Sequence, residues 1–226
     1  MQNLNSKYLI LLFILIMAGK VKAQDWANLN KYKNENSLIV SPAPGEKRIV
    51  YFGDSITEGW GTTHPEFFNT KSYINRGISG QTTSQMLLRF RPDVIELKPK
   101  LVVILAGTND IAGNTGPTTL ETILGNISSM CELAKANQIK VVLCSVLPAF
   151  DYPWKPGLEP ADKILDLNNR IQNYAKANGI AYVDYYSAMV DARKRLKTDY
   201  SADGVHPNKV GYLVMAPIVE KALLTL

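Results

Sequence analysis

The chain has 226 residues, of which 46% are hydrophobic and 20% charged, and its formal net charge is +5. This composition excludes a disordered or fibrous protein, and a length near 200 is typical of one globular domain. The two cysteines, Cys131 and Cys144, are too few for a disulfide-rich scaffold, and we expect both thiols to be unpaired.

The first 23 residues have the pattern of a secretory signal peptide. An almost wholly apolar run, Tyr8–Gly19, is 12 residues long, which is shorter than the roughly 20 residues that a membrane-spanning helix needs. Val21-Lys22-Ala23 then places small residues where a signal peptidase cleaves. We therefore expect residues 1–23 to be removed, residues 24–226 to form one domain, and the protein to be secreted or periplasmic; an uncleaved anchor is the alternative.

Cleavage also changes the charge. Removal of Lys7, Lys20 and Lys22 takes the net charge from +5 to +2. The most basic remaining segment, Arg193–Lys197, is predicted to be a solvated helix face. We therefore expect no nucleic-acid or membrane-binding patch on the mature chain, and the patterns do not determine an oligomeric state.

Apolar segments alternate with segments of helical spacing. The predicted strands are Arg48–Phe52, Tyr73–Asn75, Leu101–Ala106, Lys140–Val146 and Ala181–Tyr185. The predicted helices are Thr83–Leu97, Thr118–Asn137, Ala161–Ala177 and Asn208–Leu226, and Gln24–Lys47 is a lead-in to the first strand. This alternation predicts an α/β fold with a parallel sheet that is covered by helices on both faces.

One connection, Pro148–Pro160, is neither helix nor central strand by its composition. Its first ten residues include three prolines and three aromatic side chains. It follows the fourth predicted strand, so it emerges at the carboxyl edge of the sheet. We predict that Tyr152 and Trp154 form a wall of a substrate site; a surface loop that packs on itself is the alternative.

The segment Gly53-Asp54-Ser55 follows the first predicted strand, where open α/β sheets bind their ligands. A serine at this position becomes a nucleophile if a histidine reaches its hydroxyl. Of the two histidines, His206 has Asp203 three residues before it, and this carboxylate can orient the imidazole. For His64 we expect no such partner within its own turn, which disfavours it as the base.

Two further turns end the second and third predicted strands. The first contains Gly77 and Gly80, and the second contains Asn109 and Asp110. A glycine N–H and an asparagine amide are both suitable donors to a developing oxyanion. Each turn alone is ordinary, but three turns at the ends of consecutive strands predict one site.

In this order, the segments resemble the four sequence blocks of the SGNH (GDSL-type) esterases. The blocks are Gly53-Asp54-Ser55, the Gly80 turn, Gly107-Thr108-Asn109-Asp110 and Asp203-Gly204-Val205-His206-Pro207, and they span about Arg48 to the C-terminus. The resemblance implies a flavodoxin-like, three-layer α/β/α sandwich around a five-stranded parallel sheet.

The resemblance also implies a role for each block. Ser55 is the expected nucleophile, His206 its base and Asp203 the residue that orients the base. Ser55, Gly80 and Asn109 are the expected oxyanion donors. Gly77 is the alternative to Gly80, which is favoured by the Gln-Thr-Thr that follows it.

These roles imply an esterase. The sequence has no insertion large enough for a lid or a long apolar tunnel, so we expect short acyl groups, above all acetyl, of a small-molecule or carbohydrate ester. Export and the aromatic residues Tyr152 and Trp154 favour the carbohydrate. The alternatives are a lysophospholipase, a thioesterase or an esterase similar to platelet-activating-factor acetylhydrolase. A carbohydrate-binding protein that has lost catalysis is a further alternative. The sequence contains no cofactor motif and no metal-ligand cluster, so we expect neither.

Overall fold

A computed structural model describes residues 24–226. The predicted signal peptide, residues 1–23, lies outside the described residues. Among the described residues, no helix has the length and apolar character needed to cross a membrane.

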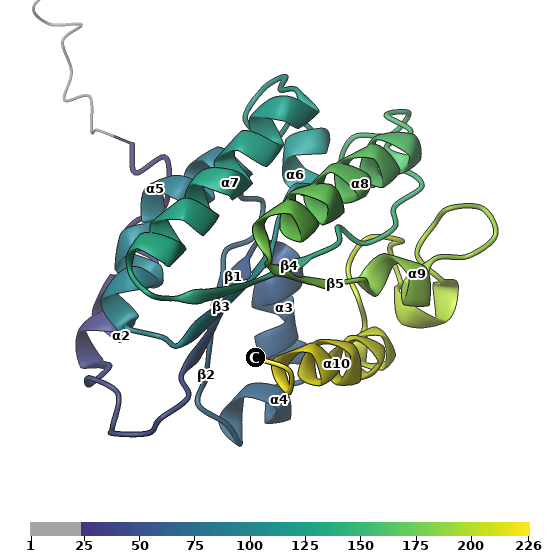
Figure 1. Ribbon diagram of the computed structural model, residues 1–226. Helices are drawn as coiled ribbons and strands as arrows, with labels where there is room; N and C mark the ends of the chain where they lie inside the picture. The colour runs from purple at the N-terminus through teal and green to yellow at the C-terminus, as the bar shows by residue number, and fades with distance from the viewer. Residues whose placement is uncertain (1–23) are drawn as a thin grey trace, which may run out of the picture.

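Five parallel strands form one sheet in the order β2-β1-β3-β4-β5 (Figure 1). The strands are β1 Ile49–Gly53, β2 Tyr73–Gly77, β3 Leu101–Leu105, β4 Lys140–Cys144 and β5 Ala181–Val183. In the central register, Gly53 lies opposite Gly77 on one side and Leu105 on the other. The carboxyl ends of β1, β2 and β3 therefore finish at the same level, and the turns that follow them lie side by side.

Helices connect the strands and cover both faces of the sheet. In chain order they are α2 Lys33–Leu38, α3 Ser55–Thr63, α4 Glu66–Asn69, α5 Thr83–Asp93, α6 Thr108–Ile111, α7 Leu120–Ala136, α8 Ala161–Asn178, α9 Tyr185–Met189 and α10 Lys209–Leu223, with short 3-10 turns η1 Ile95–Leu97 and η2 Thr198–Tyr200. The predicted three-layer α/β/α sandwich is confirmed (Figure 1).

Strand β1 shows why the sheet separates two hydrophobic cores. Val50 and Phe52 belong to one buried cluster, whereas Ile49 and Tyr51 belong to the other. Successive side chains of a strand point to opposite faces, so an uninterrupted apolar strand supplies both cores. This is the reason for the near-continuous apolar runs in the sequence.

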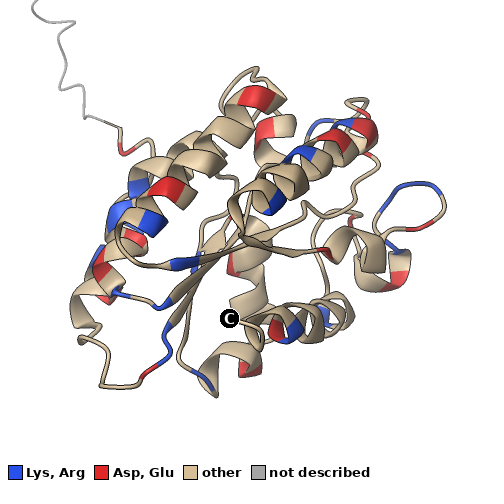
Figure 2. Ribbon diagram, viewed as in Figure 1, with Lys and Arg blue, Asp and Glu red and all other residues tan. Residues whose placement is uncertain are grey.

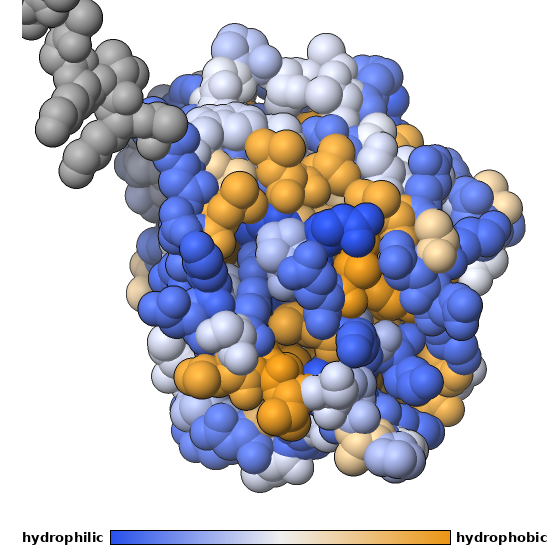
Figure 3. Space-filling model, turned by 90° about the vertical axis from the view of Figure 1, so that its left-hand side faces the viewer, coloured by the Kyte–Doolittle hydropathy of each residue, from blue (hydrophilic) through white to orange (hydrophobic). Residues whose placement is uncertain are grey.

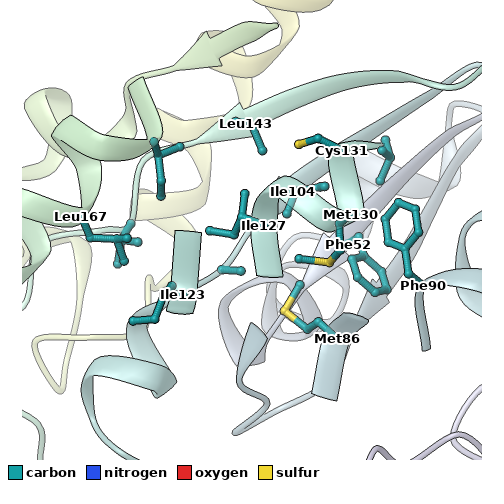
Figure 4. Packing of buried hydrophobic residues seen from close by; sticks show 14 of the residues in the cluster. Phe52, Met86, Phe90, Ile104, Ile123, Ile127, Met130, Cys131, Leu143 and Leu167 are labelled. Carbon is teal, nitrogen blue, oxygen red and sulfur yellow. The ribbon is translucent and has the colours of Figure 1, made fainter. Parts of the chain in front are cut away.

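The first core lies between the sheet and helices α5, α7 and α8 (Figure 4). Phe52 and Phe90 meet edge to face with ring centroids 5.4 Å apart, and Met86, Met130 and Ile127 fill the space around them. Each such fully buried side chain contributes roughly 1.5–3 kcal/mol relative to an exposed one. This core anchors α5, the helix that follows the turn containing Gly80.

The second core lies between the sheet and helices α3, α4, α9 and α10. Trp60 of α3 is 2% exposed and stacks between Phe67 and Tyr212, with ring centroids 4.5 Å and 5.3 Å away. Tyr212 also donates a hydrogen bond to the carbonyl of Ile56 at 2.8 Å. These contacts fix α3, which begins with Ser55, against α10, which follows His206.

Two predicted helices differ from those observed. The segment Thr83–Leu97 is helical only as far as Asp93 and continues as the turn η1; Pro92 lies in its last turn and cannot donate a backbone hydrogen bond. The basic segment Arg193–Lys197 is not a helix but a loop after α9, in which Leu196 is buried (Figure 2). Here Asp191 accepts hydrogen bonds from the backbone N–H groups of Arg193 and Arg195, which closes a turn where a helix was expected.

The strand expected over Ala181–Tyr185 ends at Val183, because Tyr185 already begins α9, and the predicted lead-in contains α2. Other predictions agree with the structure. Residues 148–160 contain no helix or strand, and α8 begins at Ala161. Cys131 and Cys144 are both buried, free thiols, and burial raises the pKa of each to about 12. The lead-in before β1 packs beside α5, on a face where apolar patches are separated by hydrophilic side chains (Figure 3).

Gly77 provides a test of how tightly α3 packs on β2. A Cβ atom there would lie 2.1 Å from the Glu58 backbone nitrogen and 2.7 Å from the Asp54 carbonyl oxygen, neither of which can move without moving the helix. We expect Gly77→Ala to lower the free energy of unfolding by about 3 kcal/mol or more, as measured by urea denaturation. Gly125→Ala is the control.

A Cβ atom at Gly125 of α7 meets nothing within 4 Å. We expect Gly125→Ala to stabilise the protein by about 0.5–1 kcal/mol, because alanine is the better helix former. Equal effects of the two substitutions would contradict the close packing of α3 on Gly77.

Candidate active site

Ser55 is held at the junction between β1 and α3. The strand ends at Gly53, Asp54 is the N-cap of α3, and Ser55 is the first helical residue. The Asp54 carboxylate accepts a hydrogen bond from the Ile56 N–H at 2.9 Å, which fixes the turn. The half-buried Ser55 hydroxyl therefore stands at the carboxyl edge of the sheet, next to a backbone N–H that no preceding helical turn can satisfy.

The structure brings Ser55, His206 and Asp203 into one hydrogen-bonded chain. Ser55 Oγ lies 2.9 Å from His206 Nε2, although the two residues are 151 positions apart. On the other side of the ring, His206 Nδ1 lies 2.7 Å from Asp203 Oδ2. An imidazole that donates through Nδ1 to a carboxylate keeps Nε2 as an acceptor for the serine proton.

Asp203 also organises the turn that carries His206. Its Oδ1 accepts hydrogen bonds from the backbone N–H groups of Val205 and His206, at 2.9 and 2.8 Å. Partial burial acts to raise the pKa of Asp203, but the hydrogen bonds from the His206 side chain, the His206 backbone and Val205 outweigh it and lower the pKa to about 2. The carboxylate is therefore ionised at any working pH and fixes the orientation of the imidazole.

Of the two glycines considered as oxyanion donors, Gly77 is the last residue of β2 and Gly80 lies in the turn that follows it. The Gly77 N–H donates to Asn75 Oδ1 at 2.9 Å, so it is already engaged. Gly80 has a φ of +77°, and within the described chain its N–H has no hydrogen-bond partner. This difference supports Gly80 over Gly77.

Asn109 lies in α6, directly after β3, and is 2% exposed. Its Nδ2 donates to the Gln81 carbonyl at 3.1 Å, and its Oδ1 accepts from Asn114 Nδ2 at 2.9 Å. The second contact fixes which end of the amide carries the hydrogens. The Asn109 amide therefore has one bonded hydrogen and one that remains for a ligand.

Two buried carboxylates support these turns. Asp110 accepts hydrogen bonds from the N–H and hydroxyl of Thr83, which ties the turn after β3 to the start of α5. Burial raises the pKa of Asp110 to about 6 against the opposing hydrogen bonds from Thr83. Burial likewise raises the pKa of Asp54 to about 6.

The two aromatic residues proposed as a substrate wall occupy different environments. Tyr152 is fully buried, and its hydroxyl lies 2.9 Å from the Thr108 hydroxyl. Trp154 is 44% exposed, stacks on Tyr152 with centroids 5.0 Å apart, and lies 5.9 Å from the His206 ring. Trp154 therefore faces the site, while Tyr152 supports it from beneath.

The second histidine has a partner that the sequence analysis did not expect. His64 Nδ1 lies 2.9 Å from the Glu66 carboxylate, so the premise that its turn offers no carboxylate was wrong. The expectation failed because Glu66 follows Pro65 at the start of α4, where the chain turns back. It is nevertheless His206 that is hydrogen-bonded to Ser55.

Two depressions lie beside the hydrogen-bonded residues Ser55, His206 and Asp203. An open cleft of about 480 Å³ contains Ser55 and His206 and is bordered by the polar side chains of Glu58, Thr62 and Ser79. A smaller recess of about 280 Å³ is lined by Asp203, Gly204 and Arg195 and by residues of the 150–156 loop, among them Phe150 and Pro153. Among residues 24–226, no group of three or more His, Cys, Asp or Glu side chains is arranged to hold a metal ion.

Sequence reasoning missed three residues that hold the site together. Glu58 accepts hydrogen bonds from the N–H and hydroxyl of Ser79. Asn114 contacts Asn109, the Gly80 carbonyl and the indole N–H of Trp154. Arg89 is buried beneath the same turn. The only available signal was position, since Glu58 is one helical turn after Ser55 and Asn114 is five residues after Asn109.

The fold and the site together define a three-layer α/β/α protein in which a serine, a histidine and a carboxylate are hydrogen-bonded in series. Residues 51–214 match the GDSL-like Lipase/Acylhydrolase family. The chain belongs to this family of carboxylic ester hydrolases, and the resemblance to the SGNH (GDSL-type) esterases is confirmed.

Individual relatives agree with this assignment. The structure of a GDSL-like lipase from Bacteroides thetaiotaomicron is 53% identical, covers 89% of this chain and 99% of its own, and superposes with a TM-score of 0.87. An acetylxylan esterase from Xylanibacter ruminicola is 25% identical over 83% of this chain and 46% of its own length. The human platelet-activating factor acetylhydrolase IB subunit alpha2 is 28% identical over 52% of each chain. The chain thus spans about half the length of the curated relatives it matches.

Asp54 predicts a pH dependence of stability. Because burial raises its folded-state pKa from 3.8 to about 6, the carboxyl group favours the folded state at low pH, and that contribution is lost as the pH rises from about 4 to about 6. Asp54→Asn keeps an acceptor for the Ile56 N–H but cannot ionise. Between pH 4 and pH 7, we expect the free energy of unfolding of the variant to rise by up to about 3 kcal/mol relative to that of the wild type. Urea unfolding at each pH measures this difference.

Asp199→Asn is the control, since Asp199 is exposed and its substitution removes the same formal charge. The difference in free energy of unfolding between Asp199→Asn and the wild type should vary little over this pH range. A pH-independent difference for Asp54→Asn would contradict the raised pKa.

Proposed function

We propose that this protein is an exported serine esterase that hydrolyses short acyl esters, chiefly acetyl esters of carbohydrates. The observation that carries the proposal is the continuous hydrogen-bonded chain from Ser55 through His206 to Asp203. The matched family and the acetylxylan esterase relative support the reaction class. Export is proposed from the leader pattern of residues 1–23.

The first half-reaction forms an acyl-enzyme. Ser55 Oγ attacks the ester carbonyl carbon while His206 Nε2 takes the hydroxyl proton, giving a tetrahedral intermediate. His206 then gives that proton to the leaving alcohol oxygen as the carbon–oxygen bond breaks. Asp203 stabilises the imidazolium and stays ionised throughout.

The negative oxygen of the intermediate needs donors that are already in place. The proposed donors are the N–H groups of Ser55 and Gly80 and the second Nδ2 hydrogen of Asn109. The second half-reaction repeats the steps with water, whose proton goes to His206. The water oxygen attacks the acyl carbon, and the bond between that carbon and Ser55 Oγ then breaks as His206 returns the proton to Oγ, which releases the acid and restores Ser55.

A short acyl group fits the character of the cleft. Each additional methylene of a long acyl chain gains about 0.8 kcal/mol only if it is buried against apolar surface. The cleft around Ser55 is open and is bordered by Glu58, Thr62 and Ser79. A long chain would gain little there, whereas an acetyl group needs no such surface.

The other side of the site suits a sugar. Trp154 presents an exposed aromatic face beside His206, and the smaller recess is lined by the exposed aromatic side chain of Phe150. The apolar C–H faces of a pyranose ring stack on such surfaces, and polar groups at the rim can accept or donate to its hydroxyls. Trp154 is therefore the proposed contact for the carbohydrate.

The second candidate is a lipid esterase, which the match to a platelet-activating factor acetylhydrolase subunit favours. It predicts the opposite substrate order, with long-chain or phospholipid-like esters turned over faster than acetylated sugars. A carbohydrate-binding protein without catalysis is distinguished from both, because a fluorophosphonate would leave its Ser55 unmodified.

The nucleophile and base are tested by single substitutions. We expect Ser55→Ala and His206→Gln to lower kcat for p-nitrophenyl acetate by about 10⁴-fold or more, because each removes a group that the intermediate requires. A fluorophosphonate should label the wild type but not Ser55→Ala, as detected by intact-protein mass.

The matched control is His64→Gln, which alters the only other histidine in the sequence. Its kcat should stay within about threefold of the wild type. Retained hydrolysis by Ser55→Ala would reject the mechanism, and an unlabelled wild type would favour the binding-protein alternative.

Trp154 is tested with paired substrates. We expect Trp154→Ala to raise KM for an acetylated xylo-oligosaccharide about 10-fold, the equivalent of a lost stacking contact of about 1–1.5 kcal/mol. The value of kcat/KM for p-nitrophenyl acetate should change far less, since that ester has no sugar ring.

Trp154→Phe separates stacking from the hydrogen bond between the indole N–H and Asn114. It keeps an aromatic face and should restore most of the affinity for the oligosaccharide. Equal losses on both substrates would show that Trp154 acts only through Asn114, and would remove the support for a carbohydrate ester.

A further inference from the structure

The turn that carries Gly80 is held by hydrogen bonds on both sides of that residue. Ser79 donates its N–H to Glu58 at 2.7 Å, and the Gly80 carbonyl accepts from Asn114 at 3.1 Å. The Gln81 carbonyl accepts from Asn109 at 3.1 Å. Gln81 therefore contacts one proposed oxyanion donor directly and follows the other in the chain.

The side chain of Gln81 points into the protein and is 3% exposed. Its Nε2 donates to the Ala27 carbonyl at 2.7 Å, and its Oε1 accepts from Nε of Arg89. Both ends of the amide are engaged, so Gln81 cannot shift unless Arg89 or the lead-in segment shifts with it.

Arg89 lies on α5 and is fully buried. Its Nη2 donates to the Gly53 carbonyl at 2.8 Å, and its Nη1 donates to the Arg76 carbonyl at 2.9 Å and to Asp93 at 3.1 Å. The guanidinium carbon is 4.2 Å from the centre of the Phe52 ring. One side chain thus contacts the end of β1, the end of β2 and the residue after Gly80.

A buried arginine is expensive to desolvate, and an apolar side chain often stabilises a core equally well. What the guanidinium adds is a rigid planar fork that holds several acceptors in fixed relative positions. The acceptors here include the Gly53 carbonyl, two residues before Ser55, and the side-chain oxygen of Gln81, the residue after Gly80. An oxyanion hole is sensitive to such placement, because displacements of about 0.5–1 Å reduce its effect.

We propose that Arg89 is a positioning residue for the oxyanion hole, acting through Gln81 and through the Gly53 carbonyl. It touches neither the substrate nor the reacting atoms. It sets the distance between Ser55 on one side and the donors Gly80 and Asn109 on the other. This role rests on the proposed esterase function.

Arg89→Lys tests the proposal, since a single ammonium keeps the charge beside Asp93 but cannot reach all the acceptors at once. The measurement is kcat and KM for p-nitrophenyl acetate on the full chain. The value of kcat is normalised to the number of sites that a fluorophosphonate labels when the labelling reaction is complete. We expect kcat per site to fall about 10- to 100-fold with KM within about threefold. The Ki of an alkyl boronic acid, a transition-state analogue, should rise by the same factor as kcat falls.

Arg76→Lys is the matched control. Arg76 is equally buried, but its side chain contacts Glu35 and Asn36 of α2 and not the Gly80 turn. It should lower Tm without changing kcat per labelled site. Gln81→Met is the second variant, and it tests the proposal if Arg89→Lys does not fold. It removes the hydrogen bond between Arg89 and Gln81. We expect it to lower kcat per labelled site without changing KM.

The possible failures are distinguishable. Unchanged kcat per labelled site in both Arg89→Lys and Gln81→Met, with only Tm lowered, would overturn the positioning role alone. A wild-type chain that neither hydrolyses the ester nor is labelled at Ser55 would overturn the proposed function and this role with it.

Discussion

The contact between Ser55 Oγ and His206 Nε2, 2.9 Å long, is the interaction on which the site depends. It joins residues near opposite ends of the described chain, so no local structure can create it. The parallel sheet does so by placing β1 between β2 and β3 and returning α10 against α3. Stacking of Trp60 on Tyr212 holds those two helices together. The second hydrophobic core is thus what holds Ser55, the proposed nucleophile, next to His206, its proposed base.

The strands and the four turns could be predicted from the sequence because their signals are local. A strand buried on both faces must be apolar throughout, and a turn that needs a left-handed residue shows a glycine, as at Gly80 and Gly204. The helix expected at Arg193–Lys197 was wrong for a related reason. Charge spacing was taken as a solvated helix face, but Asp191 closes a turn there through its own side chain. The hydrogen bonds from the backbone to the Asp191 side chain favour a turn, and they outweigh the helical spacing of the charged residues.

The residues that hold the turns in place could not be found in this way. Arg89 occupies a helix in a sequence context, Leu-Leu-Arg-Phe-Arg, that gives no reason to bury one arginine and expose the other. Its partner Gly53 is 36 positions away, and it is contacted through a backbone carbonyl that every residue type possesses. Gln81 likewise contacts a distant residue through a backbone carbonyl, that of Ala27. Contacts between side chains and backbone leave no trace in residue spacing, so only the folded chain shows them.

These contacts also explain why costly groups persist at the carboxyl edge of the sheet. Asp54 and Asp110 are buried carboxylates with raised pKa values, and Arg89 is a buried cation. Each opposes folding through desolvation, and each is offset by hydrogen bonds to the turns that carry Ser55, Gly80 and Asn109. Apolar side chains at this edge would make no such hydrogen bonds to the turns. Because an oxyanion is stabilised only by donors that are in place before it forms, rigidity is the property that this edge gains from its buried charges.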